Sequence, residues 1–422
     1  MTVRNIKNIT PIKIKDPTYV DLYSPWDLKK IGKVECISNK EVDKILDVSS
    51  NAFKNNKKYL SKIKRLEILK NCKNKLLKNS RKFANIIALE GGKPLKDSKI
   101  EVERAVNGLE LCAEALKKSH GTEIPMNINK ASVNKIAFTR KFPVGPVLAI
   151  SAFNHPLNLV IHQIGPAIAA GCPIIIKPSL ETPVSCYEFI KLLLESGLPK
   201  EFCQMINIKN HIITQKFVKD PRISFLSFIG SSDVGWKLKT MMPPGAKCAM
   251  EHGGVGSVII DKDADMKKIL PSIMRGAFYH AGQVCVSIQK VIIHEDLIDE
   301  FTELIKKAIL KIKVGDPRKI TTDVGPLIRP SEVKRIDKVI KKSISEGAEL
   351  ICGGFAKNET TYECTVLKNP KENSKVSSHE IFGPVLCLYS FNTIDEAIQK
   401  ANHDKFAFQS SVYTKNIDTA IL

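Results

Sequence analysis

The sequence has no Cys-x-x-Cys pair and no cluster of His and Cys at zinc-ligand spacing, so it gives no support for a structural metal. Its eleven cysteines are an odd number, scattered along 422 residues without the compact spacing of a disulfide framework. Such frameworks are typical of small secreted proteins, so this distribution favours free thiols in a reducing compartment. We therefore expect a cytoplasmic protein with no metal cofactor.

Long hydrophobic runs are also missing. Residues 1–16 contain no unbroken apolar stretch, and the most apolar region, residues 146–177, is interrupted by polar residues and prolines, namely Asn154, His155, Pro156, His162 and Pro166. A membrane-spanning helix needs ~20 consecutive apolar residues, so we expect neither a secretion signal nor a membrane partner. The 43% of hydrophobic residues and the mean hydropathy of −0.09 are typical of a globular α/β protein.

Arginine is scarce, although the formal net charge is +21: only 10 of the 65 basic residues are arginine, and the lysines are spread over most of the chain. Recognition of bases and phosphates favours arginine. The charge is therefore better explained by a lysine-rich solvated surface, and we expect no nucleic-acid partner. The positive field could still attract anionic substrates.

Internal repeats and low-complexity linkers are absent, yet 422 residues exceed what one hydrophobic core usually organises, so we expect two or three interleaved domains. Residues 39–118 have the spacing of consecutive amphipathic helices, broken at the Gly-Gly-Lys-Pro of residues 91–94. Residues 119–141 are irregular and strand-like and could form an outlying hairpin.

From residue 142 onward, short apolar runs alternate with helical segments, a pattern typical of βαβ units and a mostly parallel sheet. One helix is well marked: Thr182 can cap it, Pro183 suits its first turn and Gly197 ends it. The apolar runs cover residues 146–152, 172–178, 224–229, 256–261 and 290–294.

Three residues could carry chemistry. Cys285 lies in a small-residue segment just after an apparent helix at 276–282, Glu251 precedes two glycines at the end of a strand-like stretch, and Asn154 follows an apolar strand. A cysteine can act as a nucleophile, a carboxylate whose pKa is raised by burial can act as a general base, and an amide can stabilise an oxyanion. Taken alone, each also fits a structural role, as a buried thiol, a solvated turn residue and an Asx-turn residue.

Two further strand ends suggest a site for a phosphate-containing ligand. Lys177 ends one apolar run, and Gly230, Ser231 and Gly235 form a turn before a helix whose N-terminus can receive phosphate oxygens. The segment lacks the G-x-G-x-x-G spacing of the common dinucleotide fingerprint and is a weak signal by itself.

Together these segments resemble the aldehyde dehydrogenase superfamily from about Asp21 to the last residue. Six motifs occur in the family's order and at close to its spacings: FPVGPVLAISAFNHPLN, GPAIAAGCPIIIKPS, SFIGSSDVG, MEHGGVG, FYHAGQVC and HEIFGPV. The resemblance implies an α/β fold of two interleaved parallel-sheet domains. Residues 1–118 and 142–253 would form the dinucleotide-binding domain, 119–141 an oligomerisation hairpin, and 254–422 the catalytic domain.

The resemblance also implies a role for each candidate residue. Cys285 would be the nucleophile, Glu251 the base, and Asn154 with the backbone N–H of Cys285 the oxyanion hole. The cofactor, NAD or NADP, would be held by the lysine segment, the Gly-Ser turn and a C-terminal pair, in residues Lys177, Ser179, Gly230, Ser231, Glu380 and Phe382. The presence of Glu251 favours hydrolysis to a free acid, because relatives that transfer the acyl group to coenzyme A tend to lack this carboxylate.

At several positions the sequence departs from the family pattern. Leu180 replaces the glutamate that usually favours NAD, and the adjacent Glu181 is expected to point elsewhere, so the choice between NAD and NADP stays open. His155 and His252 replace an aromatic residue and a leucine, and each is either a neutral packed imidazole or a donor to a polar or anionic substrate. Arg104 is either solvated or a ligand for a substrate carboxylate or phosphate.

The chain stops inside a helix-like segment, whereas the family continues for several dozen residues that complete a partner subunit's sheet and line the substrate tunnel. We expect a fragment, with a homodimer or homotetramer forming if the C-terminal segment is present. The favoured function is oxidation of a small polar aldehyde such as a hydroxyaldehyde or semialdehyde. The alternative is a truncated, inactive relative that still binds dinucleotide.

Overall fold

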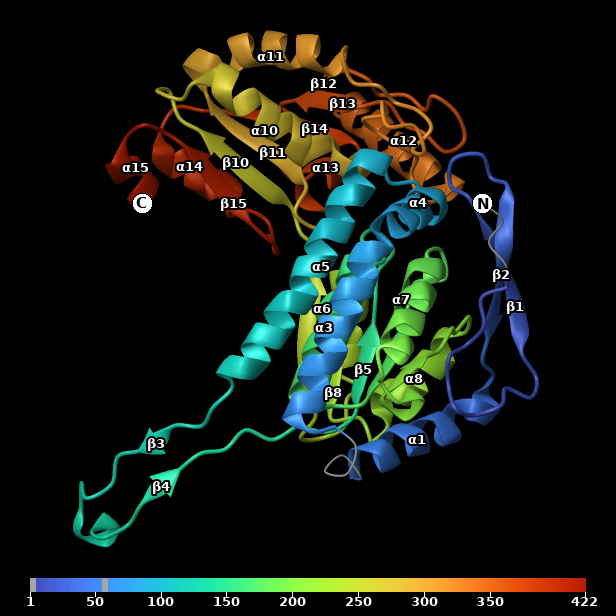
Figure 1. Ribbon diagram of the computed structural model, residues 1–422. Coiled ribbons are helices and arrows are strands. Elements are labelled where there is room, and N and C mark those ends of the chain that lie inside the picture. The colour runs from blue at the N-terminus through green and yellow to red at the C-terminus, as the bar shows by residue number, and fades with distance from the viewer. Residues whose placement is uncertain (1–4, 55–59) are drawn as a thin grey trace.

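The computed structural model describes residues 5–54 and 60–422, so residues 1–4 and 55–59 of the predicted first domain lie outside the described part. Two β-sheets, each flanked by helices, make up most of the molecule (Figure 1). The predicted α/β class is therefore confirmed. At the N-terminus, strands β1 (Thr18–Tyr23) and β2 (Lys30–Cys36) form an antiparallel ribbon.

The first sheet is parallel throughout, with the strand order β7-β6-β5-β8-β9. The order reverses between β5 and β8, and in such sheets ligands bind beyond the carboxyl ends of the strands at this reversal. Its strands are β5 (Val147–Ile150), β6 (Ile174–Lys177), β7 (Cys203–Met205), β8 (Phe225–Gly230) and β9 (Lys247–His252). The helices between them are α6 (Asn158–Ala170), α7 (Pro183–Glu195), α8 (His211–Lys219) and α9 (Ser232–Lys239), with the short η3 (Lys200–Phe202) before β7.

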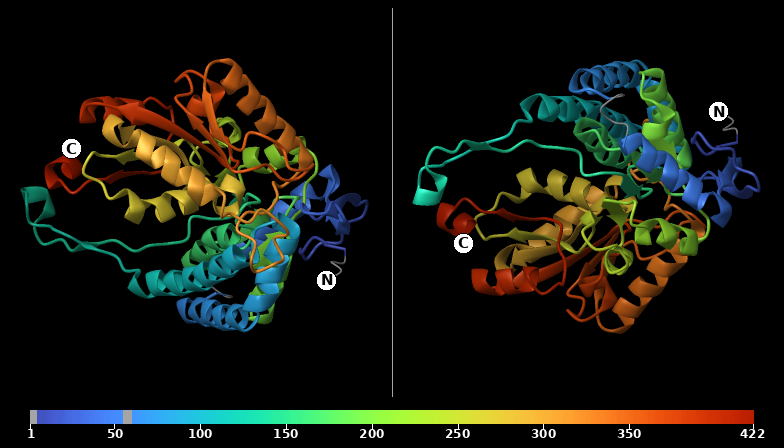
Figure 2. Two further views of the ribbon diagram at one scale, coloured as in Figure 1. Left: turned by 90° about the horizontal axis from the view of Figure 1, so that it is seen from above. Right: turned by 90° about the horizontal axis from the view of Figure 1, so that it is seen from below.

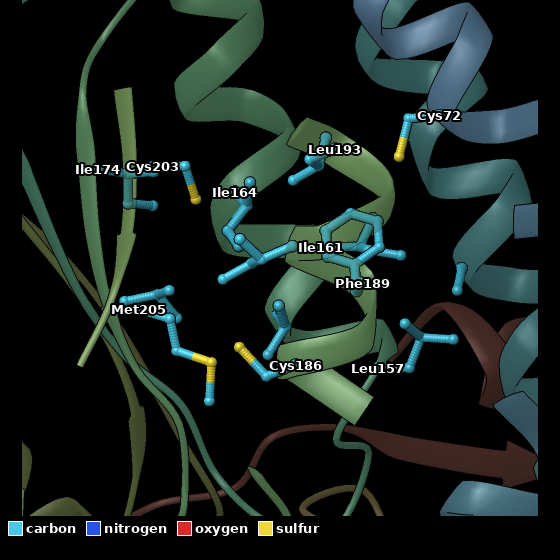
Figure 3. Close-up of a cluster of buried hydrophobic side chains, with 14 of the residues drawn as sticks. Cys72, Leu157, Ile161, Ile164, Ile174, Cys186, Phe189, Leu193, Cys203 and Met205 are labelled. Atoms are coloured by element: carbon cyan, nitrogen blue, oxygen red, sulfur yellow. The ribbon is translucent and has the colours of Figure 1, made fainter. Parts of the chain in front are cut away.

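The predicted run of N-terminal helices is confirmed. Gly92 adopts a left-handed conformation (φ +68°) that ends α4, and Pro94 precedes the first turn of α5, so the predicted Gly-Gly-Lys-Pro break is a real boundary. Figure 3 shows how side chains from α3, α6 and α7 meet those of β6 and β7 in one buried cluster. The helices are η1 (Asn39–Glu41), α1 (Val42–Lys54), α3 (Lys62–Lys78), α4 (Ser80–Gly91) and α5 (Leu95–Lys118).

Helix α7 begins at Pro183 as predicted, but it does not have the predicted cap. Thr182 occupies the N-cap position, yet its side chain makes no capping hydrogen bond. The buried carboxylate of Glu90 accepts instead from the backbone N–H groups of Val184 (2.7 Å) and Ser185 (2.9 Å). The helix is thus capped by a residue more than 90 positions away in the sequence.

The predicted hairpin is also present. Strands β3 (Glu123–Ile124) and β4 (Ala137–Phe138) pair antiparallel, joined through η2 (Lys130–Ser132), and the hairpin extends away from both sheets (Figures 1 and 2). Ile128, Ile136 and Phe138 on it are 77%, 88% and 68% exposed. These apolar side chains are available for contact with another chain.

The second sheet has the order β12-β13-β14-β11-β10-β15 and is parallel except for β12, which runs antiparallel to β13. Its strands are β10 (Gly256–Ile260), β11 (Ile288–His294), β12 (Glu349–Cys352), β13 (Thr365–Lys368), β14 (Val385–Phe391) and β15 (Ser410–Tyr413). The accompanying helices are α10 (Met266–Phe278), η4 (Tyr279–Gly282), α11 (Glu295–Ile309), α12 (Pro330–Ser345), α13 (Lys375–Ser378), α14 (Ile394–Ala401) and α15 (Ile417–Ile421).

The expected helix at 276–282 is wrong in its second half. Helix α10 ends at Phe278, and His280 (φ 50°, ψ 41°) and Ala281 (φ 55°, ψ 33°) take left-handed backbone conformations. Two consecutive non-glycine residues in this region are unusual and costly unless the surrounding packing imposes them. The chain therefore approaches Cys285 through a tight, packed turn.

The structure also bears on the predicted thiols and on membrane spanning. All eleven cysteines are free. Within residues 5–54 and 60–422, no helix has the length and apolar character needed to cross a membrane.

Candidate functional site

The candidate residues meet where the carboxyl ends of the first sheet face the second sheet. Asn154 follows β5, Lys177 is the last residue of β6, and Glu251 lies at the end of β9. Because these strands are parallel, their ends lie along one edge of the sheet. Cys285 lies in the turn between η4 and β11, and enters the site from the second sheet.

The thiol of Cys285 is half-buried and lies close to two acidic side chains. Burial raises its pKa, and the carboxylates of Glu380 and Glu251 raise it further, while backbone hydrogen bonds at Cys285 and Val286 lower it. The structure thus brings together the predicted nucleophile, the predicted base and one predicted cofactor residue. In this arrangement the thiol is protonated over a wider pH range than an ordinary cysteine.

Glu251 is exposed, so of the two environments that the sequence left open, a buried carboxylate and a solvated one, the solvated one is observed. Burial alternates along β9, and the side chain of Glu251 is on the exposed face. A carboxylate that keeps contact with solvent can accept a proton from a water molecule, so its exposure suits a hydrolytic base.

Glu380 lies over Gly253, two residues beyond Glu251. A β-carbon at position 253 would collide with the Glu380 carboxylate, so glycine is required for this close approach. Burial raises the pKa of Glu380 to about 7, partly opposed by the Arg335 guanidinium. Its Oε1 atom is buried without a hydrogen-bond partner, which fits a carboxylate that receives a ligand hydroxyl.

Phe382 joins the two halves of the site. It has a left-handed backbone conformation (φ 51°), and its ring packs against that of Phe153 with centroids 5.7 Å apart at 83°. Phe153 immediately precedes Asn154, which is only 3% exposed. The segment carrying Glu380 and Phe382 therefore contacts the loop after β5.

His155 is a packed, neutral imidazole. It is 6% exposed, and its ring stacks on Tyr279 with centroids 6.0 Å apart at 15°. Burial lowers its pKa well below the ordinary value, and the Lys93 ammonium adds to the effect. Of the two interpretations that the sequence left open, the geometry supports the packing role.

Arg104 is exposed on α5 but faces the site. The pKa of His155 is lowered first by burial, then by the positive charges of Lys93 and His280, and then by the Arg104 guanidinium. Burial and Arg104 also lower the pKa of His162 on α6, and the Glu251 carboxylate opposes this shift, so His162 lies within the influence of both Arg104 and the predicted base.

Sequence reasoning missed His162 as a site residue. It lies on α6, whereas His155 lies in the loop before that helix, so their spacing in the sequence gave no signal that the two share a site. Gly108 lies one turn along α5 from Arg104, and a β-carbon there would lie 3.8 Å from the His162 ring, an ordinary contact, so α5 and α6 lie side by side at this point.

The Lys177 segment contains one departure from expectation. Glu181, which we expected to point away, accepts a hydrogen bond from the Ser179 hydroxyl and one from Arg329 (3.1 Å). Burial lowers the pKa of Lys177, and the Glu181 carboxylate raises it, so the two side chains lie close together. Leu180 instead packs against the first hydrophobic core.

The Gly-Ser turn lies at the start of α9 as predicted. Gly230 ends β8, and Ser231 is the N-cap of α9 without a capping hydrogen bond from its side chain. A helix N-terminus with this arrangement favours phosphate oxygens. With Lys177 at the end of β6, separated from this turn only by β5 along the same sheet edge, and with the unpartnered Glu380 oxygen in the same site, these residues fit a dinucleotide.

His252 belongs to an aromatic cluster rather than to the reactive group. Its ring lies 4.7 Å from that of Phe406 and 6.0 Å from that of Trp236, and its Nδ1 lies 3.0 Å from the carbonyl oxygen of Gly253. Among the described residues, no group of three or more His, Cys, Asp or Glu side chains is placed to hold a metal ion.

Several known proteins are similar to this chain over most of its length. A model described as "Aldehyde dehydrogenase family" matches residues 13–421. A 3-sulfolactaldehyde dehydrogenase of Priestia aryabhattai is 33% identical over 402 residues, covering 95% of this chain and 83% of that protein. A lactaldehyde dehydrogenase of Methanococcus maripaludis is 34% identical over 408 residues, covering 95% and 85%.

A solved structure is similar over nearly the whole chain. The glyceraldehyde-3-phosphate dehydrogenase of Methanocaldococcus jannaschii, crystallised with NADP, superposes with a TM-score of 0.91 at 31% identity. The match covers 97% of this chain and 88% of that one.

Proposed function

The chain belongs to the aldehyde dehydrogenase family, and from this premise we propose that it oxidises a small polar aldehyde to its carboxylic acid through a thioester on Cys285. It is an NAD- or NADP-dependent aldehyde dehydrogenase. The observation that carries the proposal is the proximity of the Cys285 thiol to the Glu251 and Glu380 carboxylates at the carboxyl edge of the first sheet.

The first step is addition of the Cys285 thiolate to the aldehyde carbon. The carbonyl π electrons move to oxygen, and the amide of Asn154 with the backbone N–H of Cys285 donates to the resulting oxyanion. Asn154 suits this role because it is buried, at 3% exposure, and does not ionise. Stabilisation of this kind is worth ~10²–10³ in rate for each donor.

Collapse of the thiohemiacetal leaves a thioester on Cys285. The bound nicotinamide supplies the acceptor for the hydride that leaves the carbon. Glu251 then deprotonates a water molecule that attacks the thioester carbonyl, and the carbon–sulfur bond breaks to release the acid and regenerate the Cys285 thiolate. The exposure of Glu251 supports this role, because the base must meet bulk water.

The cofactor is assigned to the residues that fit it. Lys177 and Ser179 would bind the adenosine ribose, Gly230 and Ser231 the pyrophosphate, and Glu380 with Phe382 the nicotinamide ribose and ring. In this proposal the first sheet, with residues 1–118 and 142–253, is the dinucleotide-binding domain, and residues 254–422 form the catalytic domain. The exposed hairpin at 119–141 would serve a homodimer or homotetramer.

The substrate is proposed to be a hydroxyaldehyde or semialdehyde. The relatives named for lactaldehyde and 3-sulfolactaldehyde support a short, oxygen-rich aldehyde. Arg104 supports an anionic group at the far end of the substrate, since its guanidinium acts on His155 and His162 from the exposed side of the site. His155 would contribute packing only.

The test is an aldehyde panel with both cofactors. Lactaldehyde, 3-sulfolactaldehyde, succinic semialdehyde and an uncharged aldehyde of matched length are each mixed with NAD or NADP, and reduced nicotinamide is followed by absorbance. We expect turnover with at least one polar aldehyde and none in Cys285→Ser. Cofactor binding without any reduction would instead support the alternative of an inactive dinucleotide-binding relative. Unchanged rates in Cys285→Ser would refute the mechanism.

A further inference from the structure

We propose that the buried ion pair between Lys93 and Glu101 positions both donors of the oxyanion site, the Asn154 amide and the backbone N–H of Cys285, for the reaction. The inference rests on the proposed function. Neither residue touches the reacting atoms, so both are positioning residues and not catalytic ones. The ammonium and carboxylate side chains are 1% and 0% exposed and form a salt bridge.

The first arm of this arrangement runs from Glu101 to Asn154. The Glu101 Oε1 atom accepts hydrogen bonds from the backbone N–H groups of Leu157 (3.0 Å) and Asn158 (3.1 Å), where α6 begins. The carbonyl of His155 accepts from the N–H of Leu159 (3.0 Å), so the turn holding Asn154 continues directly into this capped end. Glu101 thereby fixes the loop after β5 against α5.

The second arm runs from Lys93 to Cys285. The Lys93 ammonium lies 5.8 Å from the centroid of the Tyr279 ring, and Tyr279 stacks on His155. Tyr279 immediately precedes His280 and Ala281, the two residues with left-handed backbone conformations in the turn before Cys285. One ammonium therefore contacts the segment before the nucleophile and, through His155, the segment that carries Asn154.

The location of the pair explains why charged groups are kept in this core. Helix α5 runs beside α6, and Glu101 lies in the second turn of α5 (Figure 1). A buried ion pair adds little net stability compared with apolar residues, but it is directional. A carboxylate that caps two N–H groups and binds an ammonium tolerates little displacement, which suits a site that loses ~10²-fold in rate for a 1 Å error.

The structure offers a matched control in Glu90. It is also a buried carboxylate, 1% exposed, and it accepts from two backbone N–H groups at the start of α7. Like Glu101 it caps a helix N-terminus, although it binds the Ser185 hydroxyl where Glu101 binds Lys93, and it contacts neither the loop after β5 nor Tyr279 in the hydrogen bonds and ring contacts of the described residues. A purely structural role would give Glu90 and Glu101 the same phenotype.

The experiment is a double-mutant cycle with Asn154→Ala. Glu101→Gln keeps a hydrogen-bond acceptor but removes the charge. Glu101→Asp keeps the charge but shortens the side chain by one methylene, and it serves as the milder variant if Glu101→Gln does not fold. Two rates are measured: kcat with an aldehyde and cofactor, and acylation of Cys285 by 4-nitrophenyl acetate. The second needs the same oxyanion stabilisation but no cofactor.

We expect each Glu101 variant to lower both rates by about tenfold or more, with a small change in the KM for aldehyde. We expect a much smaller further loss when Asn154→Ala is already present, because the donor that Glu101 positions directly is then gone and only the backbone donor at Cys285 is left to be disturbed. Glu90→Gln should combine with Asn154→Ala additively.

Additive losses for Glu101 and Asn154, or wild-type rates in folded Glu101→Asp, would overturn the positioning role. The wild type could be inactive with every aldehyde and yet be acylated by the ester, with the same coupling between Glu101 and Asn154 in the double-mutant cycle. That result would contradict the proposed function and leave the positioning role supported.

Discussion

The carboxylate of Glu380 lies directly over Gly253, with no room for a β-carbon between them. Gly253 follows the strand that carries Glu251. Burial is the largest cause of the raised pKa of Cys285, and the carboxylates of Glu380 and Glu251 raise it further. Gly253 thus lets the Glu380 carboxylate lie against the segment that follows Glu251.

Replacing this glycine tests the placement of Glu380. In Gly253→Ala the new methyl group must displace the carboxylate, so the proposed contact with the nicotinamide ribose is lost. We expect the KM for NAD or NADP to rise by about tenfold, corresponding to roughly 1.4 kcal/mol of binding. Steady-state kinetics with varied cofactor measure it.

Gly315→Ala is the control for this substitution. Its β-carbon would lie 3.5 Å from the nearest side-chain atom, which is an ordinary contact, and the position is remote from the cofactor residues. An equal rise in KM for both variants would refute the specific role of Gly253.

Loss of the base should separate the two chemical steps. Glu251→Gln leaves thioester formation intact but removes the group that activates water, so we expect a burst of about one equivalent of reduced nicotinamide and then a steady rate reduced ~10²–10⁴-fold. Stopped-flow absorbance detects the burst. A steady rate close to that of the wild type would show that another group serves as the base.

The thiol's pH dependence should respond to Glu380. Burial and the two carboxylates hold the pKa of Cys285 above its ordinary value, so the thiolate forms only as the pH rises through that elevated pKa. Removing one negative charge in Glu380→Gln lowers the pKa. The alkaline rise in the rate of iodoacetamide inactivation should therefore move to lower pH in the cofactor-free protein.

Glu372→Gln, at an exposed position, should leave that inactivation profile unchanged. A shift to higher pH in Glu380→Gln would contradict the electrostatic account.

The sequence predicted the features that depend on local pattern. The apolar runs at 146–152 and 172–178 became β5 and β6, and the irregular segment at 119–141 became the β3–β4 hairpin. Strand β9, which carries Glu251, was predicted only as a strand-like stretch and not as an apolar run, because its residues alternate between exposed and half-buried positions.

The missed features depend on distant contacts. The cap of α7 comes from Glu90 and not from Thr182, because the buried carboxylate on α4 accepts the hydrogen bonds of the free N–H groups. Helical spacing predicted a helix through His280, but the packing around Tyr279 imposes a left-handed backbone there. No local pattern encodes either outcome.

The cap of α7 also gives a stability prediction. Glu90→Ala leaves the buried N–H groups of Val184 and Ser185 without their partner, and each unpaired donor costs ~1–3 kcal/mol. We expect the free energy of unfolding to fall by roughly 2–4 kcal/mol in urea titration. Glu188→Ala, which removes a surface ion pair with Lys82, should change it little. Equal effects would contradict the capping role.

Cofactor choice should depend on Glu181. Its carboxylate lies close to Lys177 and accepts from Ser179, where it would repel the extra phosphate of NADP. In Glu181→Gln we expect the ratio of kcat/KM for NADP to that for NAD to rise severalfold. Glu332→Gln is the matched control, because Glu332 binds the same Arg329 from α12. An unchanged ratio in Glu181→Gln would place the ribose elsewhere.

The most direct test is the mass of the peptide that contains Cys285. Glu251→Gln protein is mixed with an aldehyde substrate and cofactor, quenched in acid and digested. The account predicts that this peptide gains the mass of the acyl group, and that Cys285→Ser shows no gain. Reduction of cofactor with Cys285 unmodified, or an acyl group on another residue, would contradict it.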